Sequence, residues 1–115
     1  MFKSILVPID LSDTERGKSA IAMARQVADK DSKIRLVSIL EEVPSFVASQ
    51  IPENVGVKIR ETAVSELKAI ATAAGLKGTD AEVRSGSAAS GILSTADSMG
   101  ADLIIVRSHK PGLQD

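Results

Sequence analysis

The chain has 115 residues and a mass of 12.0 kDa, which is the size of one domain with its own hydrophobic core. Hydrophobic residues make up 43% and charged residues 25%, and the net charge of -1 offers no basic field to nucleic acid or anionic lipid. The chain contains no cysteine and one histidine, which excludes disulfides, thiolate zinc sites and a cysteine nucleophile. Its apolar runs are too short to span a membrane, and its N-terminus leads directly into a strand-like segment instead of a signal peptide. We therefore expect a cytoplasmic protein with no nucleic-acid or membrane partner.

The first element is a strand, because Ile5–Ile9 is a continuous apolar run of the kind found in strands buried on both faces of a parallel sheet. The sequence Ser12-Asp13-Thr14-Glu15 then matches a capping box, with Ser12 as the residue that caps a helix. The helix that follows has one apolar stripe, made of Ala20, Ile21, Ala24, Val27 and Ala28. We expect this stripe to pack on the sheet.

Residues 34–40 predict the second strand, and the pattern before them is interrupted at Asp31 and Ser32. Residues 42–53 are irregular, and the sequence allows a lid, a dimer contact or disorder there. Pro52 marks the entrance to a long helix that ends near Gly75, where a left-handed cap is expected. The inward stripe of this helix is Ala63, Leu67, Ile70, Ala71 and Ala74.

The last third of the chain predicts a strand at residues 80–84, a helix capped by Ser87 and closed by Gly100, and a strand at residues 102–106. The inward stripe of this helix is predicted as Ala89, Ile92, Leu93 and Ala96. Strands that alternate with helices of this length require right-handed crossovers. The fold class is therefore α/β, with an open parallel sheet between two layers of helices.

Ligands of such sheets bind beyond the carboxyl ends of the strands, where the chain here places Asp10, Glu41, Gly86 and residues 107–110. The turn after the first strand contains no glycine, so it has neither a dinucleotide fingerprint nor a phosphate loop. A phosphoacceptor domain that holds Mg²⁺ between Asp10 and Asp13 is an alternative. It is disfavoured because Arg84-Ser85-Gly86 stands where such a domain has an aspartate.

Three segments together resemble the universal stress protein family in order and spacing: residues 5–12 (ILVPIDLS), 83–87 (VRSGS) and 101–109 (ADLIIVRSH). The resemblance spans the whole chain as a single domain, and residues 107–111 are similar to the variant loop of the F/G-type members that bind ATP. It implies a Rossmann-like fold of the adenine nucleotide alpha hydrolase type with strand order 3-2-1-4-5. It further implies a homodimer that responds to stress and binds an adenine nucleotide, with or without Mg²⁺. The sequence itself offers no paired general acid and base, activated nucleophile or metal cluster, so we do not expect an enzyme.

The resemblance also implies which residues would meet the nucleotide. Asp10 would lie beside the adenosine, Pro8 and Ile9 would shape the pocket, and the backbone of Ile39 would meet the adenine. The phosphates would lie at the end of the last strand, at Val106, Arg107, Ser108, His109 and Lys110. Arg107 and Lys110 replace two glycines of the family's phosphate loop, and these two cations could hold phosphate instead.

Simpler interpretations of these residues stay open. Asp10 could be only a turn former before a helix, and Arg107 and Lys110 could be ordinary surface cations. The alternative function is a universal stress protein that binds no nucleotide and acts through dimer or partner contacts. A sheet that ended at residues 103–106 would have a bare apolar edge, so we expect the functional protein to be longer than 115 residues.

Overall fold

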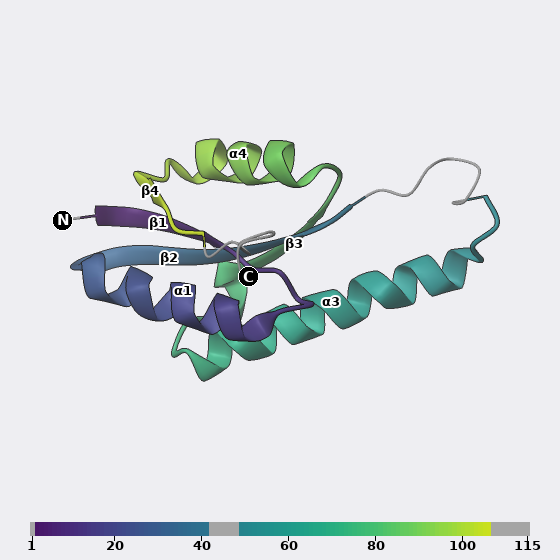
Figure 1. The fold of residues 1–115 in the computed structure, drawn as a ribbon, viewed down its shortest axis with the longest axis horizontal. Helices are drawn as coiled ribbons and strands as arrows, with labels where there is room; N and C mark the ends of the chain where they lie inside the picture. Colours follow the sequence, from purple (N-terminus) through teal and green to yellow (C-terminus); the bar gives the residue numbers. More distant parts are fainter. Residues whose placement is uncertain (1, 42–48, 107–115) are drawn as a thin grey trace, which may run out of the picture.

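The computed structural model of the protein describes residues 2–41 and 49–106, which form a three-layer α/β/α domain (Figure 1). Four strands make one parallel sheet in the order β3-β2-β1-β4, and this confirms the predicted fold class and strand order. Helices α1 and α3 cover one face of the sheet and α4 covers the other. In chain order the elements are β1 (Phe2–Pro8), α1 (Thr14–Val27), β2 (Ala28–Leu40), α3 (Glu53–Ala73), a 3-10 turn (Gly78–Asp80), β3 (Ala81–Ser85), α4 (Ala88–Met99) and β4 (Leu103–Ile104).

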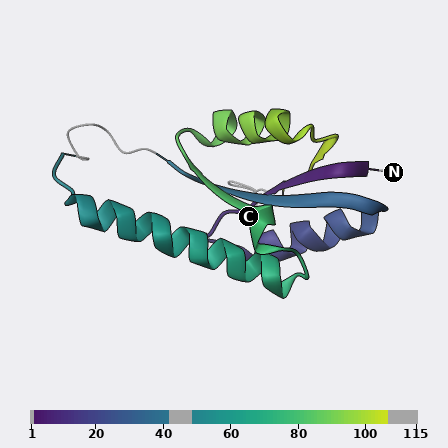
Figure 2. The same ribbon diagram turned by 180° about the vertical axis from the view of Figure 1, so that it is seen from behind.

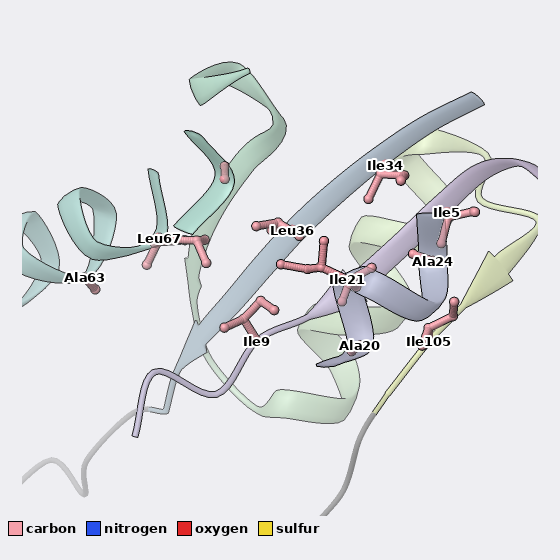
Figure 3. Close-up of a cluster of buried hydrophobic side chains, with 13 residues drawn as sticks. Ile5, Ile9, Ala20, Ile21, Ala24, Ile34, Leu36, Ala63, Leu67 and Ile105 are labelled. Atoms are coloured by element: carbon pink, nitrogen blue, oxygen red, sulfur yellow. The ribbon is translucent and has the colours of Figure 1, made fainter. Parts of the chain in front are cut away.

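The main hydrophobic core lies between the sheet and the two helices α1 and α3 (Figure 3). Alternate residues of the strands point into it, as expected from the two-residue period of a strand. The predicted stripe of α1 is buried at Ala20, Ile21 and Ala24, and that of α3 is buried at Leu67 and Ala71. Both helices therefore pack on the sheet through the faces that the sequence predicted.

The inward face of α4 differs from the prediction. Thr95 is fully buried and its hydroxyl donates a 2.8 Å hydrogen bond to the carbonyl of Gly91, whereas Leu93 is 63% exposed. Gly91 lies so close to the sheet that a Cβ there would be 2.6 Å from Cδ1 of Ile39. The inward placements of Ala89 and Leu93 were wrong, because α4 approaches the sheet through Gly91 and Thr95 instead. A threonine can be buried once its hydroxyl is bonded.

The helix ends follow the predicted chemistry with one correction. Asp13, and not Ser12, caps α1, because the Asp13 carboxylate accepts the hydrogen bond from the Arg16 amide. Ser87 caps α4 as predicted, accepting a hydrogen bond from the Ser90 amide. Gly100 closes α4 with a φ of 65°, a left-handed conformation that suits glycine.

The two strands next to β1 differ in length from the prediction. β2 begins directly after α1 at Ala28, which pairs with Phe2, and the register shifts before Lys33 pairs with Ser4. The polar residues between Ala28 and Lys33 leave no apolar pattern to read. β4 is shorter than predicted, with Leu103 and Ile104 paired to β1, and the amides of Asp102 and Ile105 donate hydrogen bonds to β1 on either side. Asp102 anchors this short strand, since its carboxylate accepts hydrogen bonds from the amides of Lys3 and Ser4, both at 3.0 Å.

The core and the corrected face of α4 are tested by two leucine truncations. Leu67→Ala removes a fully buried side chain, so we expect the free energy of unfolding to fall by about 2–5 kcal/mol in chemical denaturation. Leu93→Ala is the matched control and should change the free energy of unfolding by less than about 0.5 kcal/mol. Equal losses in the two variants would contradict the placement of α4.

Candidate functional site

A cleft of about 560 Å³ lies at the carboxyl ends of the central strands. β2 pairs with one edge of β1, and β4, later in the chain, pairs with the other edge. A parallel sheet has a crevice at its carboxyl end where the strand order reverses in this way. The cleft is lined by residues 8–13, Arg16 and Gly17 of the first turn and α1, by residues 37–41 of β2, and by Ala88, Ile92 and Val106. Its volume is in the range of small-molecule sites.

The structure brings together all the described residues that were predicted to contact the nucleotide. Pro8, Ile9, Asp10, Ile39 and Val106 all line this one cleft, although they come from three separate segments of the chain. The predicted phosphate-binding residues, Arg107, Ser108, His109 and Lys110, lie outside the described residues. The predicted irregular segment falls largely outside them as well, at residues 42–48.

Asp10 is held in a tight turn at the mouth of the cleft. Its Oδ1 accepts a 2.6 Å hydrogen bond from the Ser12 hydroxyl and a 2.9 Å bond from the Ser12 amide, and its carbonyl accepts from the Asp13 amide. The Ser12 hydroxyl bond, followed by the Ser12 amide bond, lowers the pKa of Asp10, with a smaller contribution from the positive charge of Arg16 and a small opposing effect of burial. Asp10 is therefore a fixed carboxylate that is ionised at neutral pH.

The walls of the cleft are apolar and closely packed. Ile9 is buried at one wall, and its side chain touches Gly17 so closely that a Cβ there would be 3.0 Å from Ile9 Cδ1. Ile39 packs against Gly91 of α4 in a similar way, and Ile92 and Val106 also line the cleft. Two glycines thus allow helices on opposite faces of the sheet to come close to its carboxyl end.

The charged groups of the described lining are mostly acidic. Asp10, Asp13 and Glu41 supply three carboxylates, and Arg16 supplies one guanidinium whose Nε lies 3.2 Å from Asp13 Oδ2. An aspartate can accept hydrogen bonds from ribose hydroxyls, as it does in dinucleotide-binding folds. The described part of the cleft therefore suits a ligand that combines an uncharged apolar ring with hydroxyl groups. It suits a negatively charged polyphosphate less well, because carboxylates outnumber cations in this lining.

Some lining residues were missed by sequence reasoning. Ala88 and Ile92 belong to the helix after β3, and only the tertiary fold places them over the end of β1. Arg16 lies three residues after the cap of α1, so the helical spacing turns it back toward the strand ends. A search for polar residues in the first turn of each helix that follows a strand would have found Arg16.

Gly86 lies away from this cleft. It has a φ of 132° and lines a separate hollow at the end of β3, together with Arg60 of α3 and Arg84. Arg60 donates 3.0 Å hydrogen bonds to the Ser85 hydroxyl and the Val83 carbonyl, and Arg84 pairs with Glu82 at 2.8 Å. These bonds join α3 to the edge of the sheet, so we assign this hollow a structural role.

Metal and catalytic groups are sparse in this cleft. Within residues 2–41 and 49–106 no group of three or more His, Cys, Asp or Glu side chains is arranged to hold a metal ion. The apolar walls and the fixed acceptor at Asp10 are the groups that an adenosine would require of this cleft. A Mg²⁺ ion would have to be held chiefly by the nucleotide's own phosphates.

An open parallel sheet with a cleft at its switch point and helices on both faces is a three-layer α/β/α domain. Comparison with known proteins is more specific, since the family model described as "Universal stress protein family" matches residues 1–115. The chain belongs to the universal stress protein family. None of the helices in the described ranges is long and apolar enough to cross a membrane.

Solved structures of similar fold include members of the same family. Hypothetical protein MJ0577 superposes with a TM-score of 0.74 at 22% sequence identity, over 99% of this chain and 81% of its own. The universal stress protein UspA from Lactobacillus plantarum has a TM-score of 0.60 at 20% identity, over 98% of this chain and 83% of its own. A family member from Burkholderia pseudomallei has a TM-score of 0.62 at 22% identity, over 93% and 82% of the two chains.

The turn that fixes Asp10 makes a prediction about pH. A group whose pKa is lower in the folded than in the unfolded protein stabilises the fold above its unfolded pKa, and this contribution is lost as the pH falls through the folded value. Ser12→Ala removes the largest cause of the shift and should raise the pKa of Asp10 toward its ordinary value of 3.8.

We therefore expect Ser12→Ala to be less stable than the wild type by a constant amount above about pH 5, and the deficit to shrink below about pH 4. Urea unfolding at a series of pH values measures the deficit, and NMR titration of the Asp10 carboxyl reports its pKa directly. A deficit that widens below pH 4, or an unchanged pKa of Asp10, would contradict the assigned hydrogen bonds.

Proposed function

We propose that this protein is a small cytoplasmic stress-response module that binds an adenine nucleotide, ATP, in the cleft at the carboxyl ends of β1, β2 and β4. It acts as a homodimer whose state responds to the nucleotide, and it is not an enzyme, so any ATP hydrolysis is slow and incidental. The observation that carries this proposal is the cleft itself, which gathers Pro8, Ile9, Asp10, Ile39 and Val106 at the switch point.

The chemistry of the cleft supports the adenosine end of the ligand. Ile39 lines the cleft and packs against Gly91, and under the proposal its backbone meets the adenine. Asp10 is preoriented by Ser12, so its carboxylate loses little freedom when it accepts ribose hydroxyl bonds. A fixed carboxylate beside an apolar slot selects a nucleoside over a free phosphate or a lipid chain.

The phosphates of the nucleotide need positive charge, and the described lining of the cleft has more carboxylates than cations. Arg16 is already paired with Asp13, and Asp10 and Glu41 add two further carboxylates to the lining. Under the proposal the phosphates extend toward residues 107–110, where Arg107 and Lys110 would hold them with or without Mg²⁺. Affinity should then rise from adenosine to ATP, and the rise should weaken with salt.

A second candidate is a family member that binds no nucleotide and acts through partner contacts. The specific observation in its favour is that the Asp10 turn is already complete, since Ser12 and Asp13 satisfy it without any ligand. Under this candidate Asp10 serves only as a turn former.

Variants of Asp10 separate the two candidates. Under the nucleotide proposal we expect isothermal titration calorimetry with ATP and Mg²⁺ to show binding by the wild type, and Asp10→Ala to weaken it by roughly 10- to 100-fold or more. Asp10→Asn keeps an oxygen for the Ser12 bonds but loses the charge, so it should retain the turn and still bind weakly.

The matched control is Asp97→Ala, which removes an exposed carboxylate of α4 that does not line the cleft. It should bind ATP as the wild type does. A folded wild-type protein that gives no heat with ATP, AMP or adenosine would refute the proposal and favour the partner-binding candidate, and so would equal affinity in the wild type and Asp10→Asn.

A further inference from the structure

Strand β3 lies at one edge of the sheet, because within the described ranges it pairs with β2 alone. In a parallel ladder, alternate residues direct their backbone groups to opposite sides of the strand. The Gly86 amide donates to the Leu40 carbonyl, which places Gly86 and every second residue before it on the β2 side. The backbone groups of Ala81, Val83 and Ser85 therefore point away from the sheet, where a further strand could pair with them.

The side chains of β3 give this edge little protection. Charged residues often keep a second strand away from an edge, but β3 carries one acidic and one basic residue, and these two pair with each other. Arg84 Nε lies 2.8 Å from Glu82 Oε2, and Arg35 Nη1 lies 3.3 Å from Glu82 Oε1. No proline and no shift of register interrupts the strand. Its own residues therefore leave the edge open to pairing.

Arg60 of α3 covers the middle of this edge. Its Nη2 donates a 3.0 Å hydrogen bond to the outward-facing carbonyl of Val83, and its Nη1 donates a 3.0 Å bond to the Ser85 hydroxyl. The two bonds hold a planar guanidinium across the strand, and an added strand would have to displace it. Hydrogen bonds from a charged donor are stronger than those from a neutral amide, so Arg60 competes well for this carbonyl.

Arg60 belongs to the half of α3 that packs least against the domain. This half extends past the end of the sheet in both views (Figures 1 and 2), and all residues from 53 to 62 are exposed. Since none of these residues is buried, core packing does not explain why this turn of the helix lies beside β3. The two bonds of Arg60 do explain it, because they tie the turn to the edge of the sheet.

We propose that Arg60 protects the sheet by closing the outer edge of β3 to strand addition from another polypeptide chain. The protected surface fits an extended peptide, because outward amides and carbonyls are the groups with which an added strand pairs. The edge becomes available when Arg60 is lost or when its turn of α3 moves away from β3. This inference depends neither on the nucleotide nor on the proposed homodimer.

Arg60→Ala tests the proposal, with Lys58→Ala as the matched control. Both variants remove one positive charge from the exposed half of α3, but Arg60 is the one of the two that bonds to β3. In sedimentation velocity over a concentration series, we expect Arg60→Ala to form species larger than those of the wild type. This association should begin at a concentration roughly tenfold or more below any at which the wild type shows it. Lys58→Ala should sediment as the wild type does.

A proline at position 85 tests whether this association uses β3. The Ser85 amide points outward, so Ser85→Pro removes a donor that an added strand needs and leaves the ladder with β2 intact. The double variant Arg60→Ala with Ser85→Pro should therefore sediment as the wild type does. A protein that associated only because it was destabilised would not recover, since the proline restores neither bond of Arg60.

Arg60→Lys keeps the charge and provides a second test if Arg60→Ala fails to fold. A lysine ammonium cannot bond two groups through a planar fork, so we expect association intermediate between the wild type and Arg60→Ala. Amide hydrogen exchange then locates the contact. The amides of Val83 and Ser85 should exchange more slowly in the associated sample than in the dilute one.

Three results would overturn the protective role of Arg60. They are an Arg60→Ala protein that associates no more than Lys58→Ala, association that persists in the double variant with Ser85→Pro, and slowed exchange on a surface other than β3. If Arg60→Ala does not fold, a folded Arg60→Lys protein that sediments as the wild type does would overturn it as well.

Discussion

The central strand β1 is the constraint on which the rest of this structure depends. Ile5, Leu6 and Val7 are fully buried because helices cover both faces of the sheet and strands pair on both edges of β1. The chain can satisfy all four contacts only by winding to one side of β1 and then crossing to the other, and this reversal opens the cleft. The apolar run that stabilises the fold therefore also determines where a ligand can bind.

The elements that could be predicted from the sequence are those whose signal is local. Ser87 and Gly100 mark the ends of α4 through bonds within a few residues, and both predictions were confirmed. Ser12 was misassigned as a cap because Asp13, one residue later, can make the same hydrogen bond. The Ser12 hydroxyl instead donates its hydrogen bond to Asp10. Asp102 was missed as an anchor because its partners, including Lys3, are distant in sequence.

The cleft could be predicted in part, because the ends of the strands that form it can be located from local sequence signals. Topology alone places the residues after β1 and β2 at one edge, so Asp10 and Glu41 could be selected without coordinates, whereas Ile39 was selected through the family resemblance. The depth of the cleft could not, since it depends on how closely α4 approaches the sheet at Gly91 and on Thr95, which a hydrophobic pattern treats as outward-facing. Whether these residues bind a nucleotide is a prediction that the geometry supports.

The most direct test of the account is an NMR map of where an adenine nucleotide binds. Amide spectra of labelled protein titrated with ATP and Mg²⁺ should show shifts concentrated at residues 8–13, 37–41, 88–92 and 106, with little change along the exposed half of α3. Shifts concentrated on any other surface, or no shifts at millimolar ATP, would contradict the claim that the switch-point cleft is the nucleotide site.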